Sequence, residues 1–338
     1  MTYSSNQETK SRVNSLDKSI ENFLASTKRF NRGKPSIYFL PISRPLVEIG
    51  PEDPYPPEFY VATNLLNPAR QVEIFNFTYL TEIRKLLLLL RKSMRGYELL
   101  ASAFYLRCFL ETLSFYLAQI DEIIIICEKI VVSNITDYGK LTEDEQRELL
   151  QANYELQSIR IPTTIDYHKF RISENFTKNF EVKNRADNVH KHLKKIDREI
   201  AMLHPLYSLL SEILHPNAVP SLFAGVYAGL GEGASPRVVR FDYDEEGQTK
   251  LYFDHIFVGM ILPRTKEFLN ISKKLLIEKN NKLLDAKSKC LKRGKTLARS
   301  FLKNYTNLDD PRYHAGLICP CGSNKEFKKC CGRIVSYH

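Results

Sequence analysis

Apolar and polar positions follow a helical period along most of the chain. Residues 15–30 carry apolar side chains every three or four positions, which predicts an amphipathic helix. The apolar positions of this segment are Leu16, Ile20, Phe23 and Leu24. Residues 72–95 and 97–131 are rich in leucine, isoleucine and aromatic residues and contain no proline. We therefore expect long helices that bury their apolar faces against one another.

Capping and helix-breaking residues indicate where other helices begin and end. Thr142 and Glu145 form the S/T-x-x-E pattern of a capping box, and the helix that follows should end near Ile159. Another helix is expected over 196–214, interrupted or kinked by Pro205. These signals extend the helical pattern into the middle of the chain.

Two segments depart from the helical pattern. Seven prolines fall within 34–57, which excludes a regular helix there and predicts an extended strap. The segments RVVRFDY (237–243) and QTKLYF (248–253) flank the turn sequence DEEG, which predicts a β-hairpin.

The pattern divides the chain into five predicted parts. These are an N-terminal helix and proline-rich strap (1–71), a helical core (72–230), a connector with the hairpin (231–256), a basic helix (257–304) and a linker with a cysteine-rich tail (305–338).

The positive charge belongs to the last quarter of the chain. The formal net charge is +10, but residues 264–338 alone hold 18 of the lysines and arginines and only 6 of the acidic residues. A basic face attracts RNA, ribosomes or acidic proteins over a long range. A solvated lysine-rich helix accounts for the same composition without any partner.

No stretch of the sequence is typical of a membrane span or a secretory signal. The longest apolar runs, at 86–90 and 123–127, are far shorter than the roughly 20 residues that a span needs. We therefore expect a soluble, cytoplasmic protein, in which clustered cysteines are more often metal ligands than disulfides. Cys108, Cys127 and Cys290 lie singly in helical segments and are expected to be small core residues.

Four of the seven cysteines gather near the end of the sequence with the spacing C-x-C-x8-C-C. They are Cys319, Cys321, Cys330 and Cys331. Four thiolates satisfy the tetrahedral coordination of zinc and leave no open position, so the predicted site is structural. The surrounding cations would offset the negative charge of such a centre. They are Lys325, Lys328, Lys329 and Arg333.

This stretch resembles the SEC-C motif, the zinc-binding tail of the SecA translocation ATPase that also occurs on unrelated bacterial proteins. The resemblance covers residues 318–333, with CPCGS, a lysine-rich middle containing Phe327, and CCG. The motif usually has glycine where Asn324 stands, and its last ligand is His or Cys, here Cys331. The resemblance implies a bound Zn²⁺ and a role in contacting protein or ribosome surfaces.

A second set of polar residues lies on otherwise apolar helices. Arg107 and Glu111 are four residues apart on one predicted helix, and Tyr207, Ser211 and His215 share one face of another. Buried polar groups need partners, so we expect the two faces to meet. A structural interpretation is equally available, because Arg107 with Glu111 is an ordinary helical ion pair and His215 could simply end a helix before proline.

The motifs R-x3-E and Y-x2-L-S-x3-H-P, within residues 75–225, resemble those of helical bacterial proteins related to HEPN-type and abortive-infection proteins, many of which are RNases. The resemblance implies a metal-independent RNase, acting in phage defence, and a homodimer. His215 would be the general acid or base, Arg107 would bind phosphate, and Glu111 would orient them. HEPN-type proteins carry arginine four to six residues before the histidine, whereas this chain has Leu210 and Ser211 there.

The predicted fold class is mainly α: a helical bundle with one small β-hairpin and a C-terminal zinc-knuckle tail. Two functions remain open. One is a zinc-binding helical protein that engages a protein, RNA or ribonucleoprotein partner through its tail and basic helix. The other is the RNase with Arg107, Glu111, Ser211 and His215 at its site. The sequence does not decide whether the protein is an enzyme.

Overall fold

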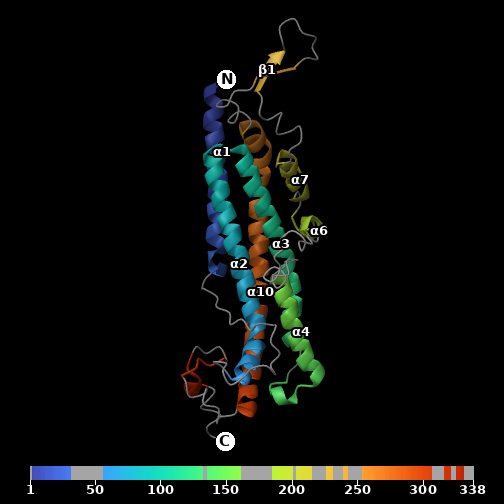
Figure 1. The fold of residues 1–338 in the computed structure, drawn as a ribbon. Helices are drawn as coiled ribbons and strands as arrows, with labels where there is room; N and C mark the ends of the chain where they lie inside the picture. The colour runs from blue at the N-terminus through green and yellow to red at the C-terminus, as the bar shows by residue number, and fades with distance from the viewer. Residues whose placement is uncertain are drawn as a thin grey trace, which may run out of the picture. The chain divides into compact units, whose positions relative to one another are not determined.

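The computed structural model is mainly helical, which confirms the predicted class (Figure 1). It describes residues 2–31, 56–131, 135–160, 185–200, 203–214, 226–230, 239–242, 253–306, 316–320 and 325–330. The helices are α1 (Thr2–Thr27), α2 (Pro57–Arg95), α3 (Leu99–Val131), α4 (Glu143–Arg160), α6 (Arg185–Asp197), α7 (Leu203–Leu214) and α10 (Leu262–Tyr305). A π-helical stretch, Phe253–Ile261, precedes α10.

The chain forms two compact units, and α2, α3 and α10 contribute residues to both. The first unit contains Met1–Arg32, Thr78–Ala118 and Val182–Glu278. The second unit contains Gly33–Phe77, Gln119–Glu181 and Lys279–His338.

The core of the first unit forms where α1 packs on α3 and α10. Leu16, Ile20 and Phe23 of α1 are fully buried, as their spacing predicts. Phe109 of α3 contacts Phe23 edge to face, with ring centroids 5.9 Å apart, and Phe268 of α10 at 6.1 Å. Such aromatic pairs add to the stabilisation that burial alone provides.

An ion-pair network joins α1 to α2 at the surface of this core. Asp17 of α1 accepts hydrogen bonds from Arg91 and Arg95 of α2, and the distance from Arg95 Nη2 to Asp17 Oδ2 is 2.5 Å. Arg91 also contacts Glu21. The network holds the two helices in register while their apolar faces are buried.

Helix α2 begins at Pro57, well before the predicted start at residue 72. Proline needs no hydrogen-bond acceptor in the first turn of a helix, so the last proline of the predicted strap opens the helix. Pro68 is accommodated inside α2. Of the predicted strap, residues 34–55 lie outside the described residues, so the extended path remains a prediction.

The capping box is confirmed. Thr142 N donates to Glu145 Oε2 at 2.9 Å, and Glu145 N donates to Thr142 Oγ1 at 3.2 Å. The expected helix over 196–214 is instead interrupted between Asp197 and Leu203, with Pro205 in the first turn of α7. Asp197 Oδ1 accepts a hydrogen bond from His204 N at 3.0 Å, which satisfies a free amide of that first turn.

The predicted hairpin between 237–243 and 248–253 is not supported. Strand β2 (Val239–Asp242) pairs antiparallel with the upstream strand β1 (Val226–Leu230). Residues 243–252, which include the predicted turn, lie outside the described residues. The sequence signal located β2 and did not predict its pairing with β1.

In the second unit, α10 packs closely on α2 and α3. Gly294 is buried against α2, where a Cβ atom would lie 2.3 Å from the carbonyl oxygen of Leu65. Cys127 and Cys290 are buried as expected, and Cys290 Sγ donates to the carbonyl oxygen of Cys127 at 3.3 Å. The helices therefore approach so closely that only small residues fit between them.

A polar anchor fixes the segment before α4 to the end of α10. Asp137 Oδ1 accepts hydrogen bonds from Ser300 Oγ at 2.6 Å and from Asn304 Nδ2 at 3.2 Å. Tyr138 packs edge to face on Phe301, with ring centroids 4.9 Å apart. This anchor positions the start of α4 beside α10.

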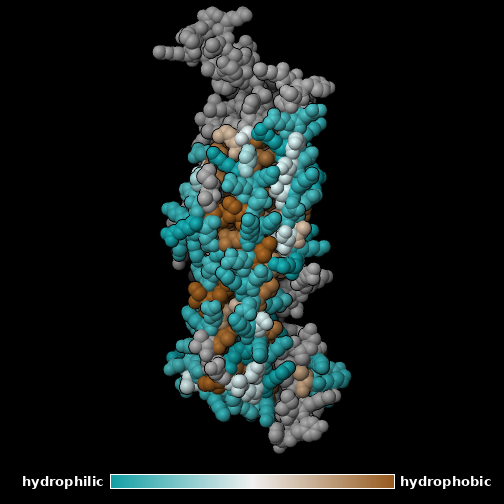
Figure 2. Space-filling view, turned by 180° about the vertical axis from the view of Figure 1, so that it is seen from behind, coloured by the Kyte–Doolittle hydropathy of each residue, from teal (hydrophilic) through white to brown (hydrophobic). Residues whose placement is uncertain are grey.

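No helix among the described residues is long and apolar enough to cross a membrane. On the face shown in Figure 2, hydrophilic side chains predominate and hydrophobic ones form small groups between them. Cytoplasmic location remains an expectation from the sequence.

Candidate functional site

The cysteine-rich tail folds back on itself. Cys319 N donates to the carbonyl oxygen of Lys325, and Phe327 N donates to that of Leu317, both at 2.7 Å. These bonds surround an antiparallel bridge between Ile318 and Glu326. The fold-back brings the segments of the first and third cysteines of the cluster together.

The third cysteine follows a single helical turn. Phe327–Lys329 form a 3₁₀ turn, and Cys330 N donates to the carbonyl oxygen of Phe327 at 2.9 Å. Cys319 is almost fully buried, whereas Cys330 is half-buried. Local backbone hydrogen bonds thus hold both cysteines in place.

The tail packs on α2 and α10 through one aromatic residue. Phe327 is fully buried, with its ring centroid 5.2 Å from that of Phe59. The hydrophobic cluster around it consists of Phe59 and Ala62 of α2, Ala298 and Leu302 of α10, Cys319 and Phe327. Cys330 packs against this cluster. The tail is therefore an integral part of the second unit.

The cysteines of the tail fit a zinc centre in their chemistry. Cys319 belongs to the hydrophobic cluster around Phe327, and Cys330 packs against it. Cys321 and Cys331 lie outside the described residues, and the described residues alone contain no cluster of three metal-ligating side chains. The four-thiolate donor set suits the tetrahedral coordination of zinc.

The predicted cations have different surroundings. Lys325 and Lys328 are exposed residues of the tail, and Lys329 Nζ pairs with Glu326 Oε2 at 2.8 Å. Arg333 lies outside the described residues. The described lysines place positive charge around the two cysteines.

Comparison with known proteins identifies this tail. Residues 318–333 match the SEC-C motif. The match includes all four clustered cysteines and confirms the resemblance seen in the sequence. No curated protein and no solved structure showed significant similarity to the chain, so the resemblance of the helical core to HEPN-type proteins is not supported.

The polar residues on α3 and α7 meet within the first unit. Tyr207 OH donates to Glu111 Oε1 at 2.8 Å, and Arg107 Nε donates to the same oxygen at 3.1 Å. Arg107 Nη2 in turn donates to Tyr207 OH at 3.2 Å, with the guanidinium carbon 5.2 Å from the ring centroid. We call these three residues the Arg107 cluster.

Burial and hydrogen bonding favour the neutral phenol of Tyr207. Burial raises the pKa of Tyr207, and its hydrogen bond to the Glu111 carboxylate raises it further. The phenol therefore stays neutral and donates. The side chains of Arg107 and Glu111 are 29% and 30% exposed, so the guanidinium remains accessible to an anion.

The other two predicted residues of this site are placed differently. Ser211 Oγ donates to the carbonyl oxygen of Tyr207 at 2.9 Å, one turn earlier in α7. His215 lies outside the described residues. Tyr207 is the residue of α7 that joins Arg107 and Glu111, and its place on the same face as Ser211 was visible in the spacing.

Proposed function

We propose that the chain is a zinc-binding helical protein that binds RNA along the exposed face of α10, beside the SEC-C motif. Cys319, Cys321, Cys330 and Cys331 hold the zinc ion. Bound zinc supplies a structural cross-link between the two segments of the tail and no catalytic position. The packing of Phe327 supports a structural tail beside the RNA-binding face, because Phe327 lies in one cluster with Ala298 and Leu302 of α10.

A row of exposed cations on α10 is the observation that supports RNA binding. Lys292, Arg299 and Lys303 recur at intervals of seven and four, so they share one helical face. All three are exposed and have no acidic partner among the described residues. No acidic residue occurs between Asp285 and the end of α10. We call these three residues the cationic stripe.

The stripe lies next to the SEC-C motif. Ala298 and Leu302, which pack against the motif, directly precede Arg299 and Lys303 in α10. From Lys292 to Lys303 the stripe spans about 16 Å at the helical rise per residue. Lys328 of the motif is a further exposed cation. An RNA backbone, with regularly spaced phosphates, matches such a row of charges.

Reversing the charge of the cationic stripe should abolish most RNA binding. The variant carries Lys292→Glu, Arg299→Glu and Lys303→Glu, and binding of single-stranded RNA is measured by fluorescence anisotropy at several salt concentrations. We expect a loss of affinity of at least tenfold and a salt dependence shallower by about 2 in slope, because three phosphate contacts are lost.

A matched variant controls for net charge. Lys10, Lys18 and Lys28 are exposed residues of the first unit, and reversing all three should leave RNA affinity within about twofold. The proposal fails if the unmodified protein does not bind RNA or if both triple variants lose binding equally. Binding of poly-L-glutamate but not of RNA would indicate an acidic protein partner instead.

The Arg107 cluster favours a second candidate function, metal-independent cleavage of RNA. Its guanidinium is oriented by two neighbours and exposed enough to hold a phosphate. In this candidate function His215 transfers the proton and Glu111 orients Arg107.

Incubation of total RNA and tRNA with the protein, without added metal, tests the second candidate. We expect cleavage that His215→Ala abolishes and that His204→Ala, which changes a histidine of α7, retains. If the unmodified protein does not cleave RNA, or if His215→Ala cleaves it as fast, this candidate is excluded.

A further inference from the structure

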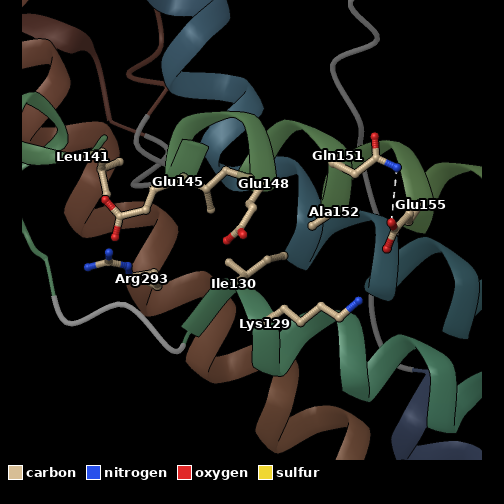
Figure 3. Close-up of a pocket in the computed structure, with 10 residues that line it drawn as sticks. Lys129, Ile130, Leu141, Glu145, Glu148, Gln151, Ala152, Glu155 and Arg293 are labelled. Atoms are coloured by element: carbon tan, nitrogen blue, oxygen red, sulfur yellow. Dashed lines mark hydrogen bonds between the residues drawn. The ribbon is translucent and has the colours of Figure 1, made fainter. Parts of the chain in front are cut away.

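A pocket of about 570 Å³ lies in the second unit between the end of α3, α4 and α10 (Figure 3). Its apolar lining includes Ile130, Leu141 and Ala152, all of which are buried. Charged side chains from all three helices complete the wall: Lys129 of α3, Glu145, Glu148 and Glu155 of α4, and Arg293 of α10. The pocket therefore combines an apolar floor with charges of both signs.

The buried part of the Arg293 side chain has no hydrogen-bond partner among the described residues. Its Nε atom is buried and has no hydrogen-bond acceptor among the described residues. Burial lowers the pKa of Arg293, against the opposing attraction of Glu145. A partly desolvated guanidinium is stabilised by a hydrogen-bonded anion, and donating two parallel bonds to a carboxylate is its preferred geometry.

Glu145 is only partly available to Arg293. Its Oε2 atom accepts hydrogen bonds from Thr142 N at 2.9 Å and from Thr142 Oγ1 at 3.2 Å, as part of the capping box. In Figure 3 the Glu145 carboxylate lies above the guanidinium, and Arg293 Nε has no hydrogen-bond acceptor among the described residues. The guanidinium thus remains able to donate hydrogen bonds to an incoming anion.

Glu148 supplies the opposite charge inside the same pocket. Its carboxylate points into the middle of the pocket, above Ile130. Neither Glu148 nor Lys129 has a charged partner in the part of the chain that the structure describes, whereas Glu155 accepts a hydrogen bond from Gln151 Nε2 at 3.2 Å. With three carboxylates and two cations, the pocket opposes a ligand that is wholly anionic.

We propose that this pocket binds a small apolar α-amino acid, with its carboxylate on Arg293, its ammonium group on Glu148 and its side chain on Ile130, Leu141 and Ala152. A zwitterion of this kind gives Arg293 and Glu148 each a partner of opposite charge, and its apolar side chain covers the floor. The site is separate from the cationic stripe and from the SEC-C motif, so it does not depend on RNA or zinc binding.

Analogues of one amino acid test the two charged contacts on the unmodified protein. L-leucine is titrated calorimetrically beside L-leucinamide, which lacks the carboxylate, and 4-methylpentanoate, which lacks the ammonium group. We expect L-leucine to bind at least tenfold more tightly than either analogue, because each lacks one charge-assisted hydrogen-bonded contact. Absence of binding by leucine, isoleucine, valine, methionine and phenylalanine would overturn the proposal.

Two variants assign each contact to its residue. Arg293→Gln should weaken L-leucine and 4-methylpentanoate at least tenfold and leave L-leucinamide unchanged, whereas Glu148→Gln should weaken L-leucine and L-leucinamide only. Lys289→Gln and Glu143→Gln, which are exposed residues of α10 and α4 outside the pocket lining, are the controls and should bind as the unmodified protein does. Equal affinity for all three probes, or loss of binding in the controls, would contradict the assignment.

Discussion

We expect one zinc ion per chain in the unmodified protein and none in Cys330→Ser. Serine cannot replace a thiolate in a four-cysteine site, and the remaining three ligands leave an incomplete tetrahedron. Structural zinc contributes about 10 kcal/mol or more to the folding of small motifs, so the tail should lose its order along with the metal. Elemental analysis of the purified protein measures the zinc content. Hydrogen exchange measures protection of the Cys319 and Phe327 amides, which donate the fold-back hydrogen bonds.

A cysteine outside the motif provides the control for this loss. Cys108 is a half-buried free thiol on α3 in the first unit, so Cys108→Ser should retain one zinc ion and full protection of the tail. Finding no zinc in freshly purified unmodified protein would refute a metal centre. Finding a full complement of zinc in Cys330→Ser would refute the assignment of Cys330 as a ligand.

Gly294→Ala is expected to destabilise the protein by about 3 kcal/mol, although alanine is normally the better helix former by about 1 kcal/mol. The new Cβ atom would lie 2.3 Å from the carbonyl oxygen of Leu65 and 3.3 Å from Leu66 Cδ2. A backbone oxygen cannot move away without displacing α2 itself. Denaturant unfolding of the two proteins measures the change in the free energy of unfolding.

Gly139→Ala is the matched control within the same unit. Its Cβ atom would meet the Tyr305 hydroxyl at 3.4 Å, an ordinary contact with the end of a side chain. We expect a change within about 0.5 kcal/mol, as for most substitutions that create no clash. If Gly294→Ala is neutral or stabilising, then α2 and α10 do not approach as closely as the structure shows.

The fold could be predicted from the sequence wherever local pattern decides it. The buried face of α1 follows from the spacing of Leu16, Ile20 and Phe23, and the capping box follows from two residues in one turn. The predicted start of α2, at residue 72, was wrong. The helix begins at Pro57, because proline is tolerated in the first turn of a helix. The pairing of β2 with β1 was not predicted, because strand pairing depends on register and neighbours that a turn sequence does not specify.

The candidate sites were predictable to the same extent. The cysteine spacing indicated a metal motif because its ligands are close in sequence. The packing of the motif on Phe59 could not be predicted, since Phe59 and Phe327 are far apart in the sequence. The pocket around Arg293 gave no signal, because an arginine in a lysine-rich helix is most simply interpreted as solvated. Only the packing of α4 beside α10 shows that its Nε atom is buried.

The packing of the SEC-C motif has a consequence for biosynthesis. Phe59 and Leu302 are synthesised before the residues that cover them, so this apolar surface remains open until the ribosome has passed residue 327. A polypeptide that ended before residue 327 would expose the apolar side chains of Phe59 and Leu302, which the motif otherwise covers. Chaperones and proteases act on such surfaces during and after translation. Docking of the motif therefore distinguishes a finished second unit from a truncated one.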